Sequence, residues 1–113
     1  AQRALGLQRD DGLWSVYLSE PATGSDTSGS AAIAAGLALG ARLGLLPSAP
    51  AALPAATRAV KAIANHLAPD GMLGGSAQLN RGGEPLQRGG FRVLAPFAMG
   101  LLASARAAVH SPA

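Results

Sequence analysis

The stretch at residues 31–46 most constrains what this chain can fold into, because it is apolar on every face of a helix. Arg42 is its only charged residue. A helix without a polar face must be surrounded by protein or by lipid. The stretch is shorter than the roughly 20 residues that a membrane span needs, and Gly36, Gly40 and Gly44 interrupt it. We therefore predict a buried helix of an inner layer, with Gly36 or Gly40 at a close contact, and no membrane association.

The spacing of apolar residues, together with Gly and Pro, predicts four helices and no strand. We expect the helices at residues 1–8, 27–43, 53–67 and 91–109. The third has one apolar stripe with charged residues between, which is typical of an outer helix, whereas the second and fourth are mostly apolar. The predicted fold class is all-α, with outer and inner helices in alternation and the two inner helices packed on each other.

Two long Gly-rich connections, at residues 9–28 and 71–90, lead into the two predicted inner helices. The connection into the third helix is short and rich in Pro. If consecutive helices run antiparallel, both long connections lie at the end where the inner helices begin. Functional groups concentrate on such loops, so we expect the functional end there.

Composition and charge exclude several classes of function. The hydrophobic share of 49% excludes a disordered tail. The net charge of +3 comes from basic residues scattered without the basic cluster of a nucleic-acid-binding surface. With no Cys, and with His66 and His110 as the only histidines, we expect no metal and no cofactor. The compartment stays open, and we favour the cytoplasm.

Two strings of residues carry a resemblance to a known family. The first is Asp-Gly-Leu-Trp at 11–14 followed by Asp-Thr-Ser-Gly-Ser-Ala at 26–31. The second is Asn-Arg-Gly-Gly-Glu at 80–84 followed by Gln-Arg-Gly-Gly-Phe-Arg at 87–92. In order and spacing they resemble the C-terminal third of glycoside hydrolase families 88 and 105, the unsaturated glucuronyl and rhamnogalacturonyl hydrolases. The resemblance covers nearly the whole chain.

The resemblance implies an (α/α)6 toroid with a pocket at the N-terminal ends of its inner helices. It also implies the reaction and the substrate, an oligosaccharide that ends in an unsaturated uronic acid. A buried aspartic acid protonates the C4=C5 double bond, water adds, and the sugar is released. The catalytic aspartates of the family lie in the first two thirds of the barrel, so we assign none here. We expect residues 1–113 to be a C-terminal fragment of one barrel domain, inactive alone.

Six residues are candidates for substrate binding, and each has an alternative role. Trp14 could stack on a sugar or could plug the loop layer. The turn that begins the second helix could bind a uronate carboxylate or could only cap the helix. Arg88 could pair with a substrate carboxylate or with Glu84, one helical turn earlier. The candidates are Trp14, Thr27, Ser28, Gly29, Ser30 and Arg88.

Two other functions remain open from the sequence. One is a non-catalytic helical scaffold or interaction domain whose long loops bind a partner. The other is a different (α/α)6 sugar enzyme, such as an epimerase, because a fold does not fix a function. If the chain is a fragment, the apolar faces at residues 31–43 and 93–102 lack neighbours. We therefore expect the isolated chain to be unstable or self-associating.

Overall fold

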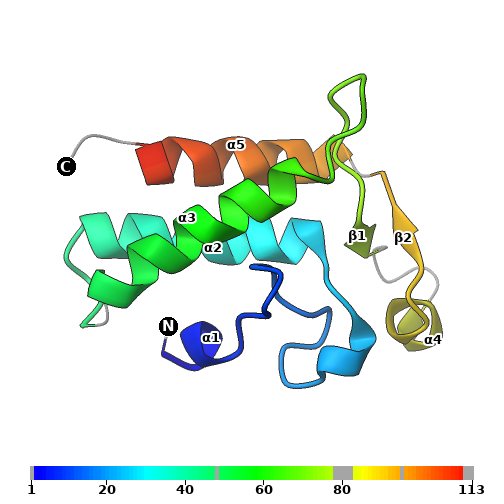
Figure 1. The fold of residues 1–113 in the computed structure, drawn as a ribbon, viewed down its shortest axis with the longest axis horizontal. Coiled ribbons are helices and arrows are strands. Elements are labelled where there is room, and N and C mark those ends of the chain that lie inside the picture. Colours follow the sequence, from blue (N-terminus) through cyan, green and yellow to red (C-terminus); the bar gives the residue numbers. More distant parts are fainter. Residues whose placement is uncertain (1, 48, 78–82, 95, 111–113) are drawn as a thin grey trace.

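In the part of the chain that it describes, the computed structural model of the protein is mostly helical, with one short strand pair (Figure 1). It describes residues 2–47, 49–77, 83–94 and 96–110. The three long helices are α2 (Thr27–Arg42), α3 (Ala49–Ala64) and α5 (Pro96–His110). The shorter elements are α1 (Gln2–Gly6), the 3-10 turn η1 (Pro21–Thr23), β1 (Ser76–Ala77), α4 (Gly83–Arg88) and β2 (Arg92–Val93).

The four predicted helices are present as α1, α2, α3 and α5, but two of them begin elsewhere than expected. Helix α3 begins at Ala49, so that Pro50 occupies its first turn, where the N–H that proline lacks is not needed. Helix α5 begins at Pro96, because Arg92 and Val93 extend to form β2. Strand β2 pairs antiparallel with β1. The prediction that the chain has no strand was wrong, since two-residue strands are too short to show alternation.

Helices α2 and α5 pack directly against each other, as predicted, and α3 contacts both. Figure 1 shows α2 and α5 starting at the same end of the molecule, while α3 runs back the other way. The long connections into α2 and α5 therefore lie at one end, together with β1, β2 and α4. We call this the loop end.

The apolar cluster between α2, α3 and α5 that contains Trp14 is built mostly from small side chains, which let the helices approach closely. Ala34 and Ala38 of α2, Ala56 of α3 and Ala105 of α5 are all buried in one apolar cluster. Trp14, from the loop before α2, is the largest side chain in that cluster. Because alanines bury little area each, one large ring contributes a disproportionate share of the buried apolar surface.

Helix α3 has the amphipathic pattern that its sequence predicted. Val60 and Ile63 are buried, whereas Arg58, Lys61 and Asn65 are exposed. One face therefore packs on the core and the other faces solvent, as an outer helix requires.

Arg42 ties the far ends of α2 and α5 together. Its Nε donates to the carbonyl oxygen of Ala108 at 2.5 Å, and its Nη2 donates to that of Val109 at 2.6 Å. The last carbonyl groups of a helix have no partner within the helix, and a cation is favoured at that negative end. The only charge in the apolar stretch is thus a cap for the neighbouring helix.

One face of α2 is exposed along most of its length. Ala32, Gly36, Leu39 and Leu43 share this face, and 54% of Leu39 and 62% of Leu43 are exposed. The described residues therefore do not surround α2 completely. A close contact occurs at Gly40, but with the loop after α2 and not with α5 as predicted: an added Cβ would lie 3.0 Å from the Leu46 side chain, whereas nothing lies within 4 Å at Gly36.

Gly12 fits a position that a side chain would strain in two ways. Its φ is +89°, and a Cβ would lie 3.2 Å from both the Arg58 carbonyl oxygen and the Ala62 Cβ. Gly71 has a φ of +87° but nothing within 4 Å. We expect Gly12→Ala to destabilise the fold by about 2–3 kcal/mol and Gly71→Ala by about 1 kcal/mol, since only the first adds a clash to the strain of a positive φ. Urea denaturation of both variants measures the difference, and equal losses would show that the loop does not press on α3.

Candidate functional site

The connections into α2 and α5 are joined to each other at the loop end by hydrogen bonds. The Thr27 N–H donates to the Gly75 carbonyl oxygen at 3.1 Å, and the Thr27 hydroxyl donates to that of Gly74 at 2.6 Å. The Thr27 and Ser76 hydroxyls are also 2.8 Å apart, and both residues are fully buried. The start of α2 and the strand β1 therefore form one rigid unit.

Asp26 is the central acceptor of this unit. Its Oδ1 accepts from the Ser28 N–H at 3.2 Å, the Ser28 hydroxyl at 2.9 Å and the Ala77 N–H at 2.8 Å. Its Oδ2 accepts from the Gly29 N–H at 2.9 Å. One carboxylate thus caps α2 and holds β1 against it. The same charge is favoured at the positive end of the helix.

The turn at Thr27, Ser28, Gly29 and Ser30 lies at the loop end, as expected, but its four backbone N–H groups already have protein acceptors. The N–H of Ser30 donates to the backbone oxygen of Asp26, and the other three donate to the acceptors described above. The arrangement favours the capping role of the turn, because no N–H remains free for a carboxylate.

Trp14 is enclosed by the core, and only 1% of it is exposed. Its indole Nε1 donates to the Ala4 carbonyl oxygen at 2.7 Å, and its backbone N–H donates to the Ser30 hydroxyl at 2.8 Å. The ring has no free face on which a sugar could stack. This geometry favours the packing alternative for Trp14.

Arg88 lies in an exposed ionic cluster between α4 and the loop before α2. Its Nε donates to Glu84 Oε1 at 2.6 Å, and its Nη1 donates to Glu20 Oε1 at 2.9 Å. The guanidinium carbon stands 4.4 Å from the centroid of the Tyr17 ring, which fits a cation–π contact. The Tyr17 hydroxyl in turn donates to Gln87 Oε1 at 2.7 Å. The pairing of Arg88 with Glu84 that the sequence left open is therefore present.

Arg92 makes a second bridge between the same two regions. Its Nε donates to the Ser25 carbonyl oxygen at 2.6 Å and its Nη2 to that of Thr23 at 2.8 Å.

The sequence did not reveal the roles of Tyr17 and Glu20 in this region. No local pattern marks them, because their partners on α4 are 68 to 70 residues away in the chain. Residues 80–82 of the second family-like string lie outside the described residues.

The ionic cluster shifts the titration of Glu20. The hydrogen bond from Arg88 lowers the pKa of the Glu20 carboxyl below its ordinary value of 4.5, and the nearby positive charge adds to this effect. The pKa of Arg88 is raised above its already high value, chiefly by the hydrogen bond to Glu20 and then by that to Glu84. Arg88 therefore stays charged at neutral pH, as arginine side chains in proteins do.

We expect the Glu20 carboxyl to titrate at a lower pH in the wild-type protein than in an Arg88→Gln variant. A depressed pKa means that the ion pair stabilises the fold above the pKa of the unfolded chain, and that this contribution is lost as the pH falls through the lowered value. Carbon NMR of the labelled side chain measures both midpoints. Raising the salt concentration to about 1 M should shrink the difference, and identical midpoints at low salt would contradict the pairing.

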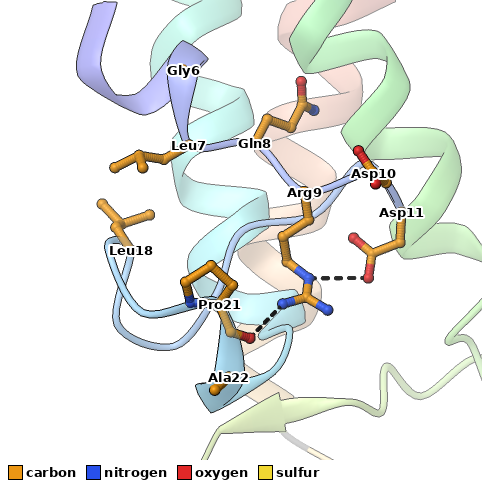
Figure 2. Close-up of a pocket in the computed structure, with 9 residues that line it drawn as sticks. All are labelled: Gly6, Leu7, Gln8, Arg9, Asp10, Asp11, Leu18, Pro21 and Ala22. Atoms are coloured by element: carbon orange, nitrogen blue, oxygen red, sulfur yellow. Dashed lines mark hydrogen bonds and ion pairs between the residues drawn. The ribbon is translucent and has the colours of Figure 1, made fainter.

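An open hollow of about 700 Å³ lies beside this end, between the segment after α1 and the turn η1 (Figure 2). Leu7, Leu18 and Pro21 give it an apolar side, and Arg9 crosses it. Arg9 donates to Asp11 Oδ2 at 3.2 Å, to the Ser15 hydroxyl at 3.1 Å and to the Pro21 carbonyl oxygen at 2.9 Å. Through these three hydrogen bonds, Arg9 holds the connection before α2 in its observed conformation.

The described ranges contain no grouping of three or more His, Cys, Asp or Glu side chains that could hold a metal ion. Within the same part of the chain, no helix has the length and apolar character needed to cross a membrane.

Known proteins resemble this chain both in sequence and in fold. Residues 1–86 match the family described as Glycosyl Hydrolase Family 88. Two crystal structures of possible members of the GH105 family have a similar fold, although no curated protein matches the sequence. The first is from Salmonella enterica subsp. enterica serovar Paratyphi A str. ATCC 9150, with a TM-score of 0.76 and 21% identity. The second is from Klebsiella pneumoniae subsp. pneumoniae MGH 78578, with a TM-score of 0.72 and 24% identity.

The similarity covers 93% of this chain and 28% of each of those two chains. The chain therefore spans little more than a quarter of the length of these structures. The family match covers the Asp-Gly-Leu-Trp loop, all of α2 and α3, and the chain as far as residue 86, within α4. The resemblance inferred from the two strings of residues is confirmed, and the chain belongs to Glycosyl Hydrolase Family 88.

Proposed function

We propose that this chain is the C-terminal part of one (α/α)6 barrel enzyme that removes unsaturated uronic acid from oligosaccharides made by polysaccharide lyases. The observation that carries the proposal is the family match over residues 1–86. The reaction is protonation of the C4=C5 double bond and addition of water, followed by release of the sugar. The acid that donates this proton lies in a part of the barrel that these residues do not form.

The arrangement of the loop end supports this proposal. Helices α2 and α5 both start there, and their N-terminal connections are fastened to each other by Asp26 and Arg92. In our proposal this end faces the substrate pocket. Trp14 and the Thr27 to Ser30 turn hold the loops in place from beneath, while Arg88, with 41% of its side chain exposed, is the group that can reach a ligand.

A direct test follows the double bond of the substrate. The complete enzyme is incubated with an unsaturated uronyl disaccharide produced by a lyase, and the ultraviolet absorbance of the C4=C5 bond is recorded. We expect the absorbance to fall while the neutral sugar is released. If the absorbance stays constant although the enzyme is folded, the proposal is rejected and a scaffold is favoured. If the enzyme instead converts a saturated sugar, offered as a second substrate, into its epimer, it is an epimerase.

The exposed face of α2 supports the barrel part of the proposal. Leu39 and Leu43 are 54% and 62% exposed, and the other two residues of this face, Ala32 and Gly36, carry no charge. An inner helix of a closed barrel would bury these side chains against a further helix. Contiguous apolar patches of this kind are uncommon on soluble monomers.

We expect residues 1–113, expressed alone, to self-associate through this face. Replacing Leu39 and Leu43 with glutamine should shift the protein toward monomer in sedimentation experiments, because the apolar surface that drives association is removed. Replacing the exposed Lys61 of α3 with glutamine is the matched control and should change nothing. A wild-type monomer that unfolds cooperatively with a stability of about 5 kcal/mol or more, as independent domains do, would instead indicate a complete domain.

A further inference from the structure

Arg88 can bind a carboxylate in two ways, and in each of them one of the two donors is bonded to a carboxylate of the protein itself. A guanidinium binds a carboxylate best through two parallel N–H bonds, using either Nη1 with Nη2 or Nε with Nη2. Here Nη1 is bonded to Glu20 and Nε to Glu84. Among the described residues, Nη2 of Arg88 makes no hydrogen bond, so each pair of donors is only half used.

We propose that Glu20 competes with the carboxylate of an acidic sugar for binding to Arg88. Tyr17 is the positioning residue that holds the guanidinium of Arg88 in place. This inference rests on the proposed function, and it names the residues that set the affinity for the acidic group. A uronate approaching from solvent takes Nη1 and Nη2 together and displaces Glu20. Arg88 keeps its bond to Glu84 and its place over the Tyr17 ring during this exchange.

Exposure makes the exchange feasible. The side chains of Arg88 and Glu20 are 41% and 47% exposed, so neither is locked by packing. Ion pairs between exposed side chains are weak, because water and salt screen them. A single-point contact to Glu20 is therefore readily replaced by a two-point contact to a ligand.

Tyr17 distinguishes this cluster from an ordinary surface ion pair. Its ring faces the guanidinium at 4.4 Å, and its hydroxyl is fixed by the bond to Gln87. The ring therefore limits the orientations of Arg88 whether Glu20 or a ligand is bound. A planar cation held on an aromatic face loses less freedom on binding a carboxylate, which favours affinity.

The chain positions of these residues place the exchange between the two long connections. Glu20 and Tyr17 precede α2, whereas Arg88 and Gln87 are on α4, between β1 and β2. Because Glu20 links the two regions, its displacement removes one of their connections, while Arg92 keeps its bonds to Ser25 and Thr23. The loop end thus stays assembled when the ligand binds.

The experiment uses the complete enzyme and an unsaturated uronyl disaccharide, with its methyl ester as the substrate that lacks the charge. Replacing Glu20 with glutamine should lower KM for the acid by about two- to fivefold, the scale of one exposed ion pair, and leave kcat unchanged. Replacing Arg88 with lysine should raise KM for the acid by about tenfold, because the positive charge remains but the two parallel N–H donors of the guanidinium are lost. Neither change should alter KM for the ester.

Tyr17 is tested with two variants. Tyr17→Leu removes the ring face and should raise KM for the acid by about threefold, on the scale of an exposed cation–π contact. Tyr17→Phe keeps the ring and should restore KM to within about twofold of the wild-type value, because only one part-buried hydroxyl bond is lost. Rescue by phenylalanine separates positioning from a general loss of folding.

The outcomes separate this inference from the proposed function. If the wild-type enzyme fails to act on the acid, the proposed function is wrong. If the enzyme is active but the Glu20→Gln variant has an unchanged or higher KM, Glu20 is not a competitor. If the Arg88 variant affects acid and ester equally, Arg88 does not bind the carboxylate.

Discussion

Replacing Trp14 with alanine should destabilise the protein by about 3–5 kcal/mol, the range for removing a buried aromatic ring. The ring is 1% exposed and packs in the cluster with Ala34, Ala38 and Ala56. Those small side chains cannot extend into the space that the ring leaves. Because the whole stability of a domain is about 5–15 kcal/mol, this one substitution can remove most of it. Denaturation by urea under identical conditions measures the loss.

Phenylalanine at the same position is the informative control. Trp14→Phe keeps a ring in the core but loses the Nε1 bond to the Ala4 carbonyl oxygen, so we expect a smaller loss of about 1–2 kcal/mol. The pair of variants also tests the stacking role that the sequence left open for Trp14. A folded Trp14→Ala enzyme of normal stability with a much higher KM would favour that role over packing.

Replacing Asp26 with alanine has the second largest expected effect. Loss of the helix cap costs about 0.5–2 kcal/mol, and leaving the N–H of the buried Ala77 without its acceptor costs about 1–3 kcal/mol more. The expected total is about 1.5–5 kcal/mol. Hydrogen exchange should show that protection is lost at both Gly29 and Ala77, because one carboxylate accepts from both.

Asp70 provides the matched control for Asp26. It also accepts a bond from the N–H two residues later, that of Met72 at 3.0 Å, but it lies on an exposed turn. Asp70→Ala should cost less than about 1 kcal/mol, because water can replace the lost bond. A loss at Asp70 as large as that at Asp26 would mean that the link between α2 and β1 contributes nothing.

The role of Asp26 explains why this end of the molecule suits a binding site. A site requires its contact groups to be held in fixed positions by a supporting set of bonds. Asp26 and Arg92 supply those bonds from beneath, and their partners are mostly backbone atoms. The exposed side chains of Arg88, Glu20 and Tyr17 can then exchange partners without loss of the scaffold.

Much of the fold could be predicted from the sequence because it depends on short-range patterns. The apolar run of α2, the amphipathic stripe of α3 and the cap ahead of Thr27 are each encoded within a few residues. The connections into α2 and α5 are long, whereas the connection into α3 is short. With consecutive helices antiparallel, this difference was enough to predict that α2 and α5 start at the same end. The motifs at residues 11–14 and 26–31 identified the family, because their order and spacing are specific.

The tertiary structure alone decided the features that depend on contacts between distant residues. One tryptophan in a polar loop can stack on a ligand or enter the core, and the space left by the alanines of α2 and α3 directs Trp14 inward. The pairing of β1 with β2 shortened the last helix. The partners of Arg88 from the loop before α2 likewise depend on where that loop and α4 meet. Such contacts follow from how the helices pack and the loops close, which no local periodicity records.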